Sequence, residues 1–211
     1  MIGTGDKNRQ FIKAGHRPES PNGNSSISAG AEDLRSRAQL LSLREKLEHN
    51  HFLLERLSAS STRLIQALEL GDVYEATAEI IANLIGSEEV AIFHYSSASK
   101  TFSLAWSWGV ETAALQLFAS GAGMFGRAVH KGVSQFRDRQ PDALLLPHEQ
   151  NLTACIVLKS GDEILGVIAI FGLLPQKNRL EWADFELLKF LEIYAAAAIQ
   201  FHELQKKQVA P

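Results

Sequence analysis

The chain of 211 residues balances 21 Lys and Arg against 24 Asp and Glu, for a formal net charge of -3. Without a basic surplus it lacks the electrostatic signature of a nucleic-acid binder, and we expect no nucleic-acid partner. No apolar run approaches the roughly 20 residues needed to span a bilayer, and the N-terminus lacks the apolar segment of a secretion signal. A cytoplasmic protein without membrane insertion is therefore expected.

Residues 1–30 predict a disordered tail. Gly, Pro, Ser and Asn make up nearly half of this stretch, and its few large apolar residues cannot bury enough surface to offset the entropy of ordering it. The mild positive charge of the tail leaves open a docking arm for an acidic partner, although so few charges add little affinity once salt screens them. A second flexible end is expected at residues 206–211.

Residues 31–70 predict one long helix, rich in Leu, Glu, Arg and Gln and free of Gly and Pro. Leucines recur at alternating spacings of three and four, which places them on a single seam facing a partner helix. One polar residue within such a seam, here Asn50, typically fixes register and strand number. We predict that residues 31–59 form a coiled coil joining two parallel copies, whereas residues 60–70 lie on their own domain. The predicted interface residues are Leu40, Leu43, Leu47, Asn50, Leu54 and Leu57.

Residues 60–205 are predicted to form one α+β domain, because helices flank an antiparallel series of short strands. The two late strands, joined by a Gly161-Asp162 turn, are apolar at odd and even positions, which is typical of central strands covered on both faces. In chain order we expect a helix at 73–85, strands at 90–95 and 102–108, a helix at 111–118, a Gly-rich turn at 120–123, a helix at 124–130, a strand at 133–137, a polar loop at 138–151, strands at 153–158 and 164–171, and a helix at 179–205.

Four segments of this domain occur in a characteristic order. They are the first two helices at 64–84, the Gly-rich turn with its short helix and exit strand at 121–138, the hairpin at 154–170, and the start of the last helix at 180–188. Together they resemble a GAF domain, the sensor module of cyclic-nucleotide phosphodiesterases, phytochromes and many bacterial regulators. The resemblance implies a GAF-like antiparallel sheet of five or six strands in the order 2-1-5-4-3. It further implies that the first and last helices build a dimer on one face, while any ligand lies on the opposite face.

No catalytic or metal-binding residues are found, and we expect no enzyme. The single cysteine, Cys155, falls in the middle of a strand, where a buried Cys acts as a small hydrophobe, so bilin attachment is not expected. The GAF proteins that reduce free methionine sulfoxide resolve through several cysteines, which this chain lacks. The phosphodiesterase motif for cyclic nucleotides is not visible, and His148-Glu149 lacks the paired histidines of a zinc motif.

The sequence does predict a candidate ligand site, although the ligand is unknown. Phe102, Leu104, Trp106 and Trp108 are predicted to share one strand face, which suits a planar ligand as well as ordinary packing. Backbone N–H groups after Gly123 could receive an anion, and a loop histidine could ligate a haem iron, as it does in some GAF sensors. The candidate ligand-binding residues are Trp106, Trp108, Phe118, Phe125, Phe136, Arg137 and His148.

The resemblance implies a bacterial-type sensory or regulatory module that binds a small molecule or partner and signals through its dimeric coiled coil. Few residues follow the last helix, so we expect output through a separate protein such as a kinase or transcription regulator. The alternative is a ligand-free protein-interaction and dimerisation module, with its pocket filled by Trp106, Trp108 and Phe125.

Overall fold

The computed structural model describes residues 23–139 and 144–209, with the side chains of its first helix from Asp33 onward. Most of the predicted tail, residues 1–22, lies outside this part, as do residues 210 and 211. The chain divides into two compact units, Met1–Leu47 and Glu48–Pro211. Among the described residues, no helix combines the length and apolar character required to cross a membrane.

Helix α1 runs over Gly23–Leu70, and it starts within the stretch predicted to be a tail rather than at residue 31. The reason lies in the sequence after Pro21, since no proline interrupts the chain before Pro141. The helix ends at Gly71, whose φ of +78° and 2.8 Å hydrogen bond from its N–H to the Ala67 carbonyl form a left-handed cap.

The leucine seam of α1 falls into an exposed part and a packed part. Leu64 is buried, and Leu57 and Leu68 pack partly against the core of their own domain. Leu57, expected at the dimer interface, is thus partly engaged within its own chain. The remaining interface candidates have no such cover: Leu40, Leu43, Leu47, Asn50 and Leu54 are all exposed.

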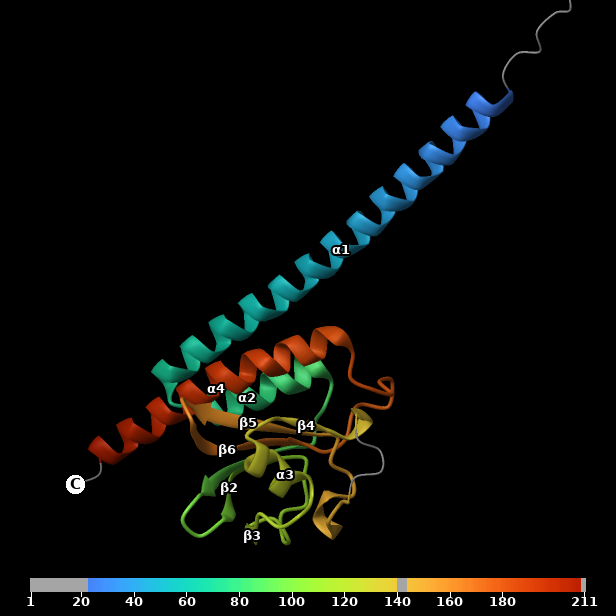
Figure 1. Ribbon diagram of the computed structural model, residues 1–211. Coiled ribbons are helices and arrows are strands. Elements are labelled where there is room, and N and C mark those ends of the chain that lie inside the picture. Colours follow the sequence, from blue (N-terminus) through green and yellow to red (C-terminus); the bar gives the residue numbers. More distant parts are fainter. Residues whose placement is uncertain (1–22, 140–143, 210–211) are drawn as a thin grey trace, which may run out of the picture. The chain divides into compact units, whose positions relative to one another are not determined.

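A six-stranded antiparallel sheet lies at the centre of the second unit, in the order β3-β2-β1-β6-β5-β4 (Figure 1). Without β3 this is the predicted order 2-1-5-4-3, and the fold class is the predicted α+β. The strands are β1 (Val90–Ser96), β2 (Thr101–Trp108), β3 (Leu117–Ala119), β4 (Gln135–Phe136), β5 (Ala154–Ser160) and β6 (Glu163–Ile170).

The helix predicted at 111–118 was wrong. The segment instead forms turns and then strand β3, where Phe118 pairs with Phe102 of β2. The N–H of Leu104 donates to the carbonyl of Gln116 over 3.0 Å, which extends this edge of the sheet. Tertiary pairing here outweighs the helical propensity of Ala113, Ala114 and Leu115.

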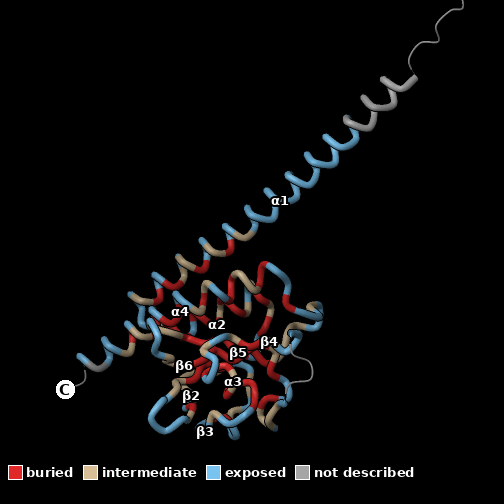
Figure 2. The backbone as a smooth tube through the Cα atoms, viewed as in Figure 1, coloured by how far each residue is buried: buried red, intermediate tan, exposed pale blue. Residues whose placement is uncertain are grey.

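Helices cover one face of the sheet, and a shorter helix with loops covers the other (Figure 1). The first face carries α2 (Val73–Ile80), the π-helical turn η1 (Ile81–Ile85) and α4 (Trp182–Val209), together with the end of α1. The second face carries α3 (Met124–Lys131) and the loops around it. Buried positions concentrate in the sheet between these layers (Figure 2). Strands β5 and β6 are buried on both faces, as the sequence predicted.

A bulge in β2 corrects the predicted placement of the tryptophans. Ile92 of β1 pairs with Trp106, but the next residue, Phe93, pairs with Leu104, so one residue of β2 is left over. Such an extra residue reverses the alternation of side chains between the faces. Leu104 therefore joins the α3 face, whereas Trp106 packs against the helical face. The prediction that all four apolar side chains share one face was wrong.

Candidate functional site

The α3 face of the sheet is filled by four phenylalanines, Phe93, Phe102, Phe118 and Phe125, here called the aromatic cluster. Its ring centroids lie 5.1 to 6.4 Å apart. Three of the four, all except Phe118, are fully buried. These are ordinary distances for aromatic pairs that stabilise a core.

The predicted ligand residues are divided between the two faces. Phe118, Phe125 and His148 do come together: the His148 ring lies 4.6 Å from Phe118 and 6.0 Å from Phe125 between centroids. Trp106 and Phe136 pack on the helical face, with Phe136 4.9 Å from the ring of Phe185. The remaining two predicted residues take up other contacts. Trp108 pairs with Val90 at the end of β2, and Arg137 donates to the carbonyl of Gln150.

The N-terminus of α3 already holds an anion, and it belongs to the chain itself. The buried carboxylate of Glu149 accepts 2.8 Å hydrogen bonds from the N–H groups of Phe125 and Leu146. A carboxylate is favourable there because the helix dipole is positive at that end. A Cβ on Gly123 would lie 1.9 Å from Oε2 of Glu149, which accounts for the glycine. The sequence predicted these N–H groups as an anion site but not their partner, Glu149, which lies 24 residues from Phe125.

Haem does not fit beneath His148. The Nε2 atom of His148 is buried and has no hydrogen-bond partner among the described residues. However, the rings of Phe118 and Phe125 occupy the space against the imidazole, and a macrocycle would have to displace them. Among the described residues, no group of three or more His, Cys, Asp or Glu is arranged to hold a metal ion.

Cys155 is fully buried in β5, and burial, with a smaller effect of the nearby Glu149 carboxylate, raises the pKa of its thiol well above the usual value. Because the thiolate is the reactive form, we expect Cys155 not to react with the thiol reagent DTNB in the native protein at pH 8. In guanidinium chloride one thiol per chain should react within minutes. Rapid native labelling would contradict the burial of this strand.

A hollow of about 300 Å³ lies beside the aromatic cluster, where the loop after β2, the turn η3 (Pro147–Glu149) and the flanks of β1 and β6 meet. We call it the loop hollow. No sequence pattern predicted it, because its lining comes from four separate segments, and of its residues only His148 had been predicted as a ligand contact. Its lining residues are Glu89, Gly109, Val110, Glu111, Ala114, Leu115, Pro147, His148, Gln150, Asn151 and Phe171.

A buried ion-pair network joins α1 to α4. The carboxylate of Asp184 accepts from Nη2 of Arg56 over 3.1 Å and from Nζ of Lys177 over 2.7 Å. The backbone N–H of Glu181 also donates to this carboxylate, over 2.7 Å. Arg56 and Lys177 reach further, to the carbonyls of Leu84 and Ile85 at the end of η1. The Asp184 carboxylate and its two cations thus link α1, η1 and the start of α4.

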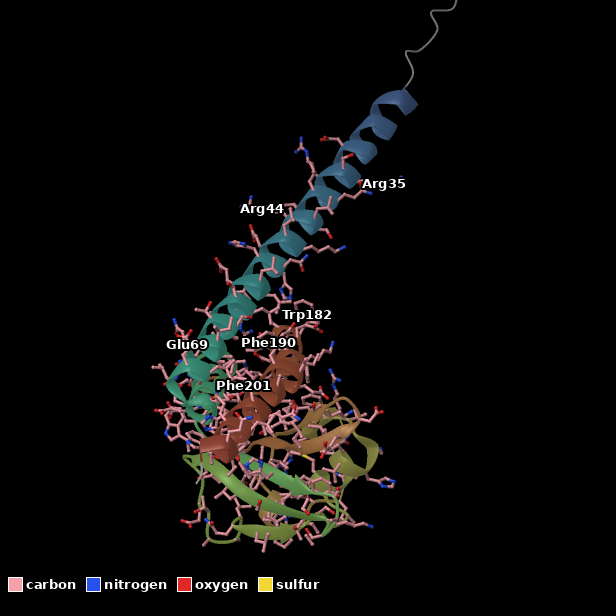
Figure 3. The ribbon with its side chains drawn as sticks, turned by 90° about the vertical axis from the view of Figure 1, so that its left-hand side faces the viewer. Arg35, Arg44, Glu69, Trp182, Phe190 and Phe201 are labelled. Carbon is pink, nitrogen blue, oxygen red and sulfur yellow. The ribbon has the colours of Figure 1, made fainter. Side chains whose placement is uncertain are left out.

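Helix α4 carries an apolar stripe on its outer surface, formed by residues that recur at spacings of four and three. Figure 3 shows Phe190 and Phe201 along this helix. Tyr194 and Phe201 are 56% and 49% exposed, and the ring of Phe190 stacks on that of Tyr194 with centroids 4.5 Å apart. The α4 stripe consists of Phe190, Tyr194, Ala197, Phe201 and Leu204.

The sheet order, the two layers of helices and the Gly-rich turn before α3 define a GAF-domain fold. Solved structures support this assignment. The GAF domain of a phosphoenolpyruvate-protein phosphotransferase from Coxiella burnetii matches with a TM-score of 0.58 and 15% identity, over 74% of this chain and 96% of that one.

Two further structures share the fold with different activities. A fragment of a methyl-accepting chemotaxis protein gives a TM-score of 0.55 and 18% identity, over 70% of this chain and 98% of that one. Free methionine-R-sulfoxide reductase from Neisseria meningitidis, solved with its substrate, gives 0.50 and 18%, over 71% and 93%. No protein-family model matches the sequence, and no curated protein matches it. Regulatory chains and an enzyme therefore share this architecture, and function has to be argued from the residues.

Proposed function

We propose that this chain is a sensory or regulatory GAF module that works as a homodimer and has no catalytic output of its own. The observation that carries the proposal is the α4 stripe. A surface helix normally exposes polar residues, and a contiguous exposed apolar face indicates an interaction site.

The occupant that we propose for the stripe is a second copy of the chain. Spacings of four and three are those of a helix that packs lengthwise against another helix. Helix α1 presents the same spacing at its exposed leucines Leu40, Leu43 and Leu47. Two helices of one chain with the same unpartnered pattern suit a symmetric dimer, in which each surface meets its own copy.

Signalling would then follow from a shift in how the helices pack on the sheet. A ligand or partner shifts the equilibrium between two helix arrangements only by the difference between its binding free energies for them. The Arg56–Asp184–Lys177 network gives the helices a specific attachment to the domain. A separate output protein, such as a kinase or transcription regulator, would read the change.

The absence of catalysis is part of the proposal, and Cys155 supports it. The fold occurs in a free methionine-R-sulfoxide reductase, and thiol chemistry depends on an accessible thiolate. The single cysteine of this chain is instead buried within a central strand.

A second candidate function is a ligand-free interaction module. The aromatic cluster favours it, since the face that binds ligands in the family is packed with the chain's own side chains. Both candidates share the dimer and differ only in whether a small molecule controls it.

The dimer is tested by replacing Phe201 with Glu. We expect light scattering coupled to size exclusion to show that the wild-type chain is a dimer. Phe201→Glu should weaken dimerisation at least tenfold, because two buried carboxylates would face each other across the symmetric interface. Gln116→Glu is the matched control, because it adds the same charge at an exposed position next to the edge strand β3, away from α4 in the sequence. A wild-type monomer, or a dimer that Phe201→Glu leaves intact, would contradict the proposal.

A further inference from the structure

A second hollow, of about 280 Å³, lies between the first turns of α4 and the neighbouring strands β4 and β5. We call it the α4 hollow. Ile156 and Leu188 line it, and both are buried members of the core on the helical face. The α4 hollow is therefore on the other side of the sheet from the aromatic cluster and from the ligand position that the family resemblance implied.

Two aromatic rings and one arginine form part of this lining. The rings of Phe136 and Phe185 have centroids 4.9 Å apart. The guanidinium of Arg139 lies over both rings, 4.0 Å from the centroid of Phe185 and 5.1 Å from that of Phe136. Stacking on aromatic faces holds an arginine side chain in place and leaves the N–H groups at the edge of its planar guanidinium free to donate.

The positive charge of Arg139 has no counterion within the described part of the chain, where it forms no ion pair. Glu186 and Lys189 also line the hollow, but they pair with each other over 2.6 Å. A guanidinium with a free edge suits a carboxylate, because two parallel N–H groups match the two carboxylate oxygens.

Glu192, the other acidic residue of the hollow, does not take the place of that counterion. Burial raises the pKa of its carboxyl above the usual value, against smaller effects of Lys159 and a hydrogen bond from Ser134. Phe185, on which Arg139 stacks, precedes Glu192 by seven residues, or about 10 Å along the helix. Salt screens most of the attraction between charges at that distance.

The size and walls of the α4 hollow fit an aromatic ligand. Its volume of about 280 Å³ corresponds to roughly nine water volumes of about 30 Å³ each. A molecule of about nine non-hydrogen atoms, such as benzoate, would fill it. The indole of Trp182 adds a large apolar wall, of which 47% is exposed. Apolar and aromatic walls with a few polar groups are typical of small-molecule sites.

We propose that the α4 hollow binds a small aromatic carboxylate. The guanidinium of Arg139 holds the carboxylate, and the rings of Trp182 and Phe185 contact the aromatic body. This inference rests on the sensory function proposed above and names its ligand class.

The α4 hollow also borders the attachment of α1. Trp182 is the first residue of α4, and its ring lies 4.5 Å between centroids from that of His49 in α1 (Figure 3). Two residues further along α4, Asp184 pairs with Arg56 of α1. A ligand that moves Trp182 therefore acts on α1 through a direct ring contact beside the Arg56–Asp184–Lys177 network.

The test is ligand-observed NMR titration of the intact chain with three matched probes: benzoate, benzyl alcohol and benzylammonium. We expect benzoate to bind with a millimolar or lower Kd, at least tenfold more tightly than the neutral and cationic probes. Arg139→Gln should weaken benzoate binding at least fivefold. Arg137→Gln is the matched control, since Arg137 is also exposed, lies two residues away and does not line the hollow.

The indole signals of the protein locate the bound probe. The chain has three tryptophans, and the indole N–H signal of Trp182 is identified by its loss in Trp182→Phe. Benzoate should shift this signal and leave that of Trp108 unchanged, because Trp108 is 44% exposed but does not line the hollow.

Four results would overturn the inference: no binding of benzoate, equal binding of the three probes, an equal loss in Arg137→Gln, or an unshifted Trp182 signal. Light scattering on the same samples separates the two proposals. A dimer that binds no benzoate leaves the dimeric module standing and removes only its ligand, whereas a monomer that binds benzoate keeps the site and removes the dimeric module.

Discussion

Replacing Asp184 with Ala is expected to lower the free energy of unfolding by about 3–5 kcal/mol, because removing one partner of a buried ion pair leaves the other charge uncompensated. The side chain of Asp184 is 2% exposed and that of Arg56 is 8% exposed, so water cannot replace the lost carboxylate. Lys177 loses its partner in the same variant. The measurement is urea denaturation followed by circular dichroism.

Glu186→Ala is the control for Asp184→Ala. Glu186 also lies in α4 and pairs with Lys189 over 2.6 Å, but the lysine side chain is 67% exposed. An exposed pair of this kind contributes about 0–1 kcal/mol. Equal losses in the two variants would show that the network is not the buried attachment described above. A further variant, Arg56→Met with Asp184→Leu, should recover part of the lost stability. Apolar pairs often replace buried ion pairs without cost, but Lys177 and the Glu181 N–H still lack the carboxylate.

The attachment also bears on signalling. Arg56 lies in α1 between the exposed leucines of the seam and Leu57, the first seam residue that packs on the domain. Arg56 binds Asp184 directly, so a change in the position of this carboxylate acts on α1 through the guanidinium. We therefore expect the Arg56→Met, Asp184→Leu variant to retain the dimer while losing any effect of ligand on the helices.

Local patterns accounted for much of the fold. The spacing of Leu64 and Leu68 predicted which part of α1 lies on the domain, and two-sided apolar strands predicted the central position of β5 and β6. These features could be predicted because the side-chain periods of helices and strands depend on residues that are close in the sequence. The Gly161-Asp162 turn fixed the hairpin in the same way.

What the sequence did not predict depends on residues that are distant along the chain. The pairing of Arg56 with Asp184 joins residues 128 positions apart. Glu149 reaches the start of α3 from a loop, and β3 forms because β2 offers it an edge. The bulge in β2 leaves no mark in the alternation of Phe102, Leu104, Trp106 and Trp108, yet it decides which face each side chain occupies.

The candidate site in the structure differs from the predicted one because it too depends on residues that are distant along the chain. Phe118, Phe125 and His148, predicted as ligand contacts, lie in ring contact with one another in a packed cluster. The space beside them is bordered by Glu89 and Glu111, which the sequence did not mark out, since isolated glutamates are common on surfaces. Only the fold shows that they border one hollow.

Replacing Phe125 with Ala is expected to cost about 3–5 kcal/mol of unfolding free energy, the usual range for truncating a fully buried phenylalanine. Phe125 contacts Phe93, Phe102 and Phe118, and none of its surface is exposed. Trp108→Ala is the control. Although larger, Trp108 is 44% exposed at the end of its strand, and we expect a loss of about 1 kcal/mol. Urea denaturation of both variants measures the difference.

The same pair of variants decides whether the α3 face is a core or a ligand pocket. If the aromatic cluster is a filled core, Phe125→Ala opens an apolar cavity, and benzene should raise the melting temperature of the variant but not of the wild type, because such cavities stay dry and accept apolar guests. If the face is a pocket, benzene should raise the melting temperature of the wild type as well. The loss of unfolding free energy in Phe125→Ala should then be about that of Trp108→Ala, because removing a ring that lines open space leaves little new cavity. The first outcome favours the ligand-free interaction module, and the second favours a ligand pocket at the aromatic cluster.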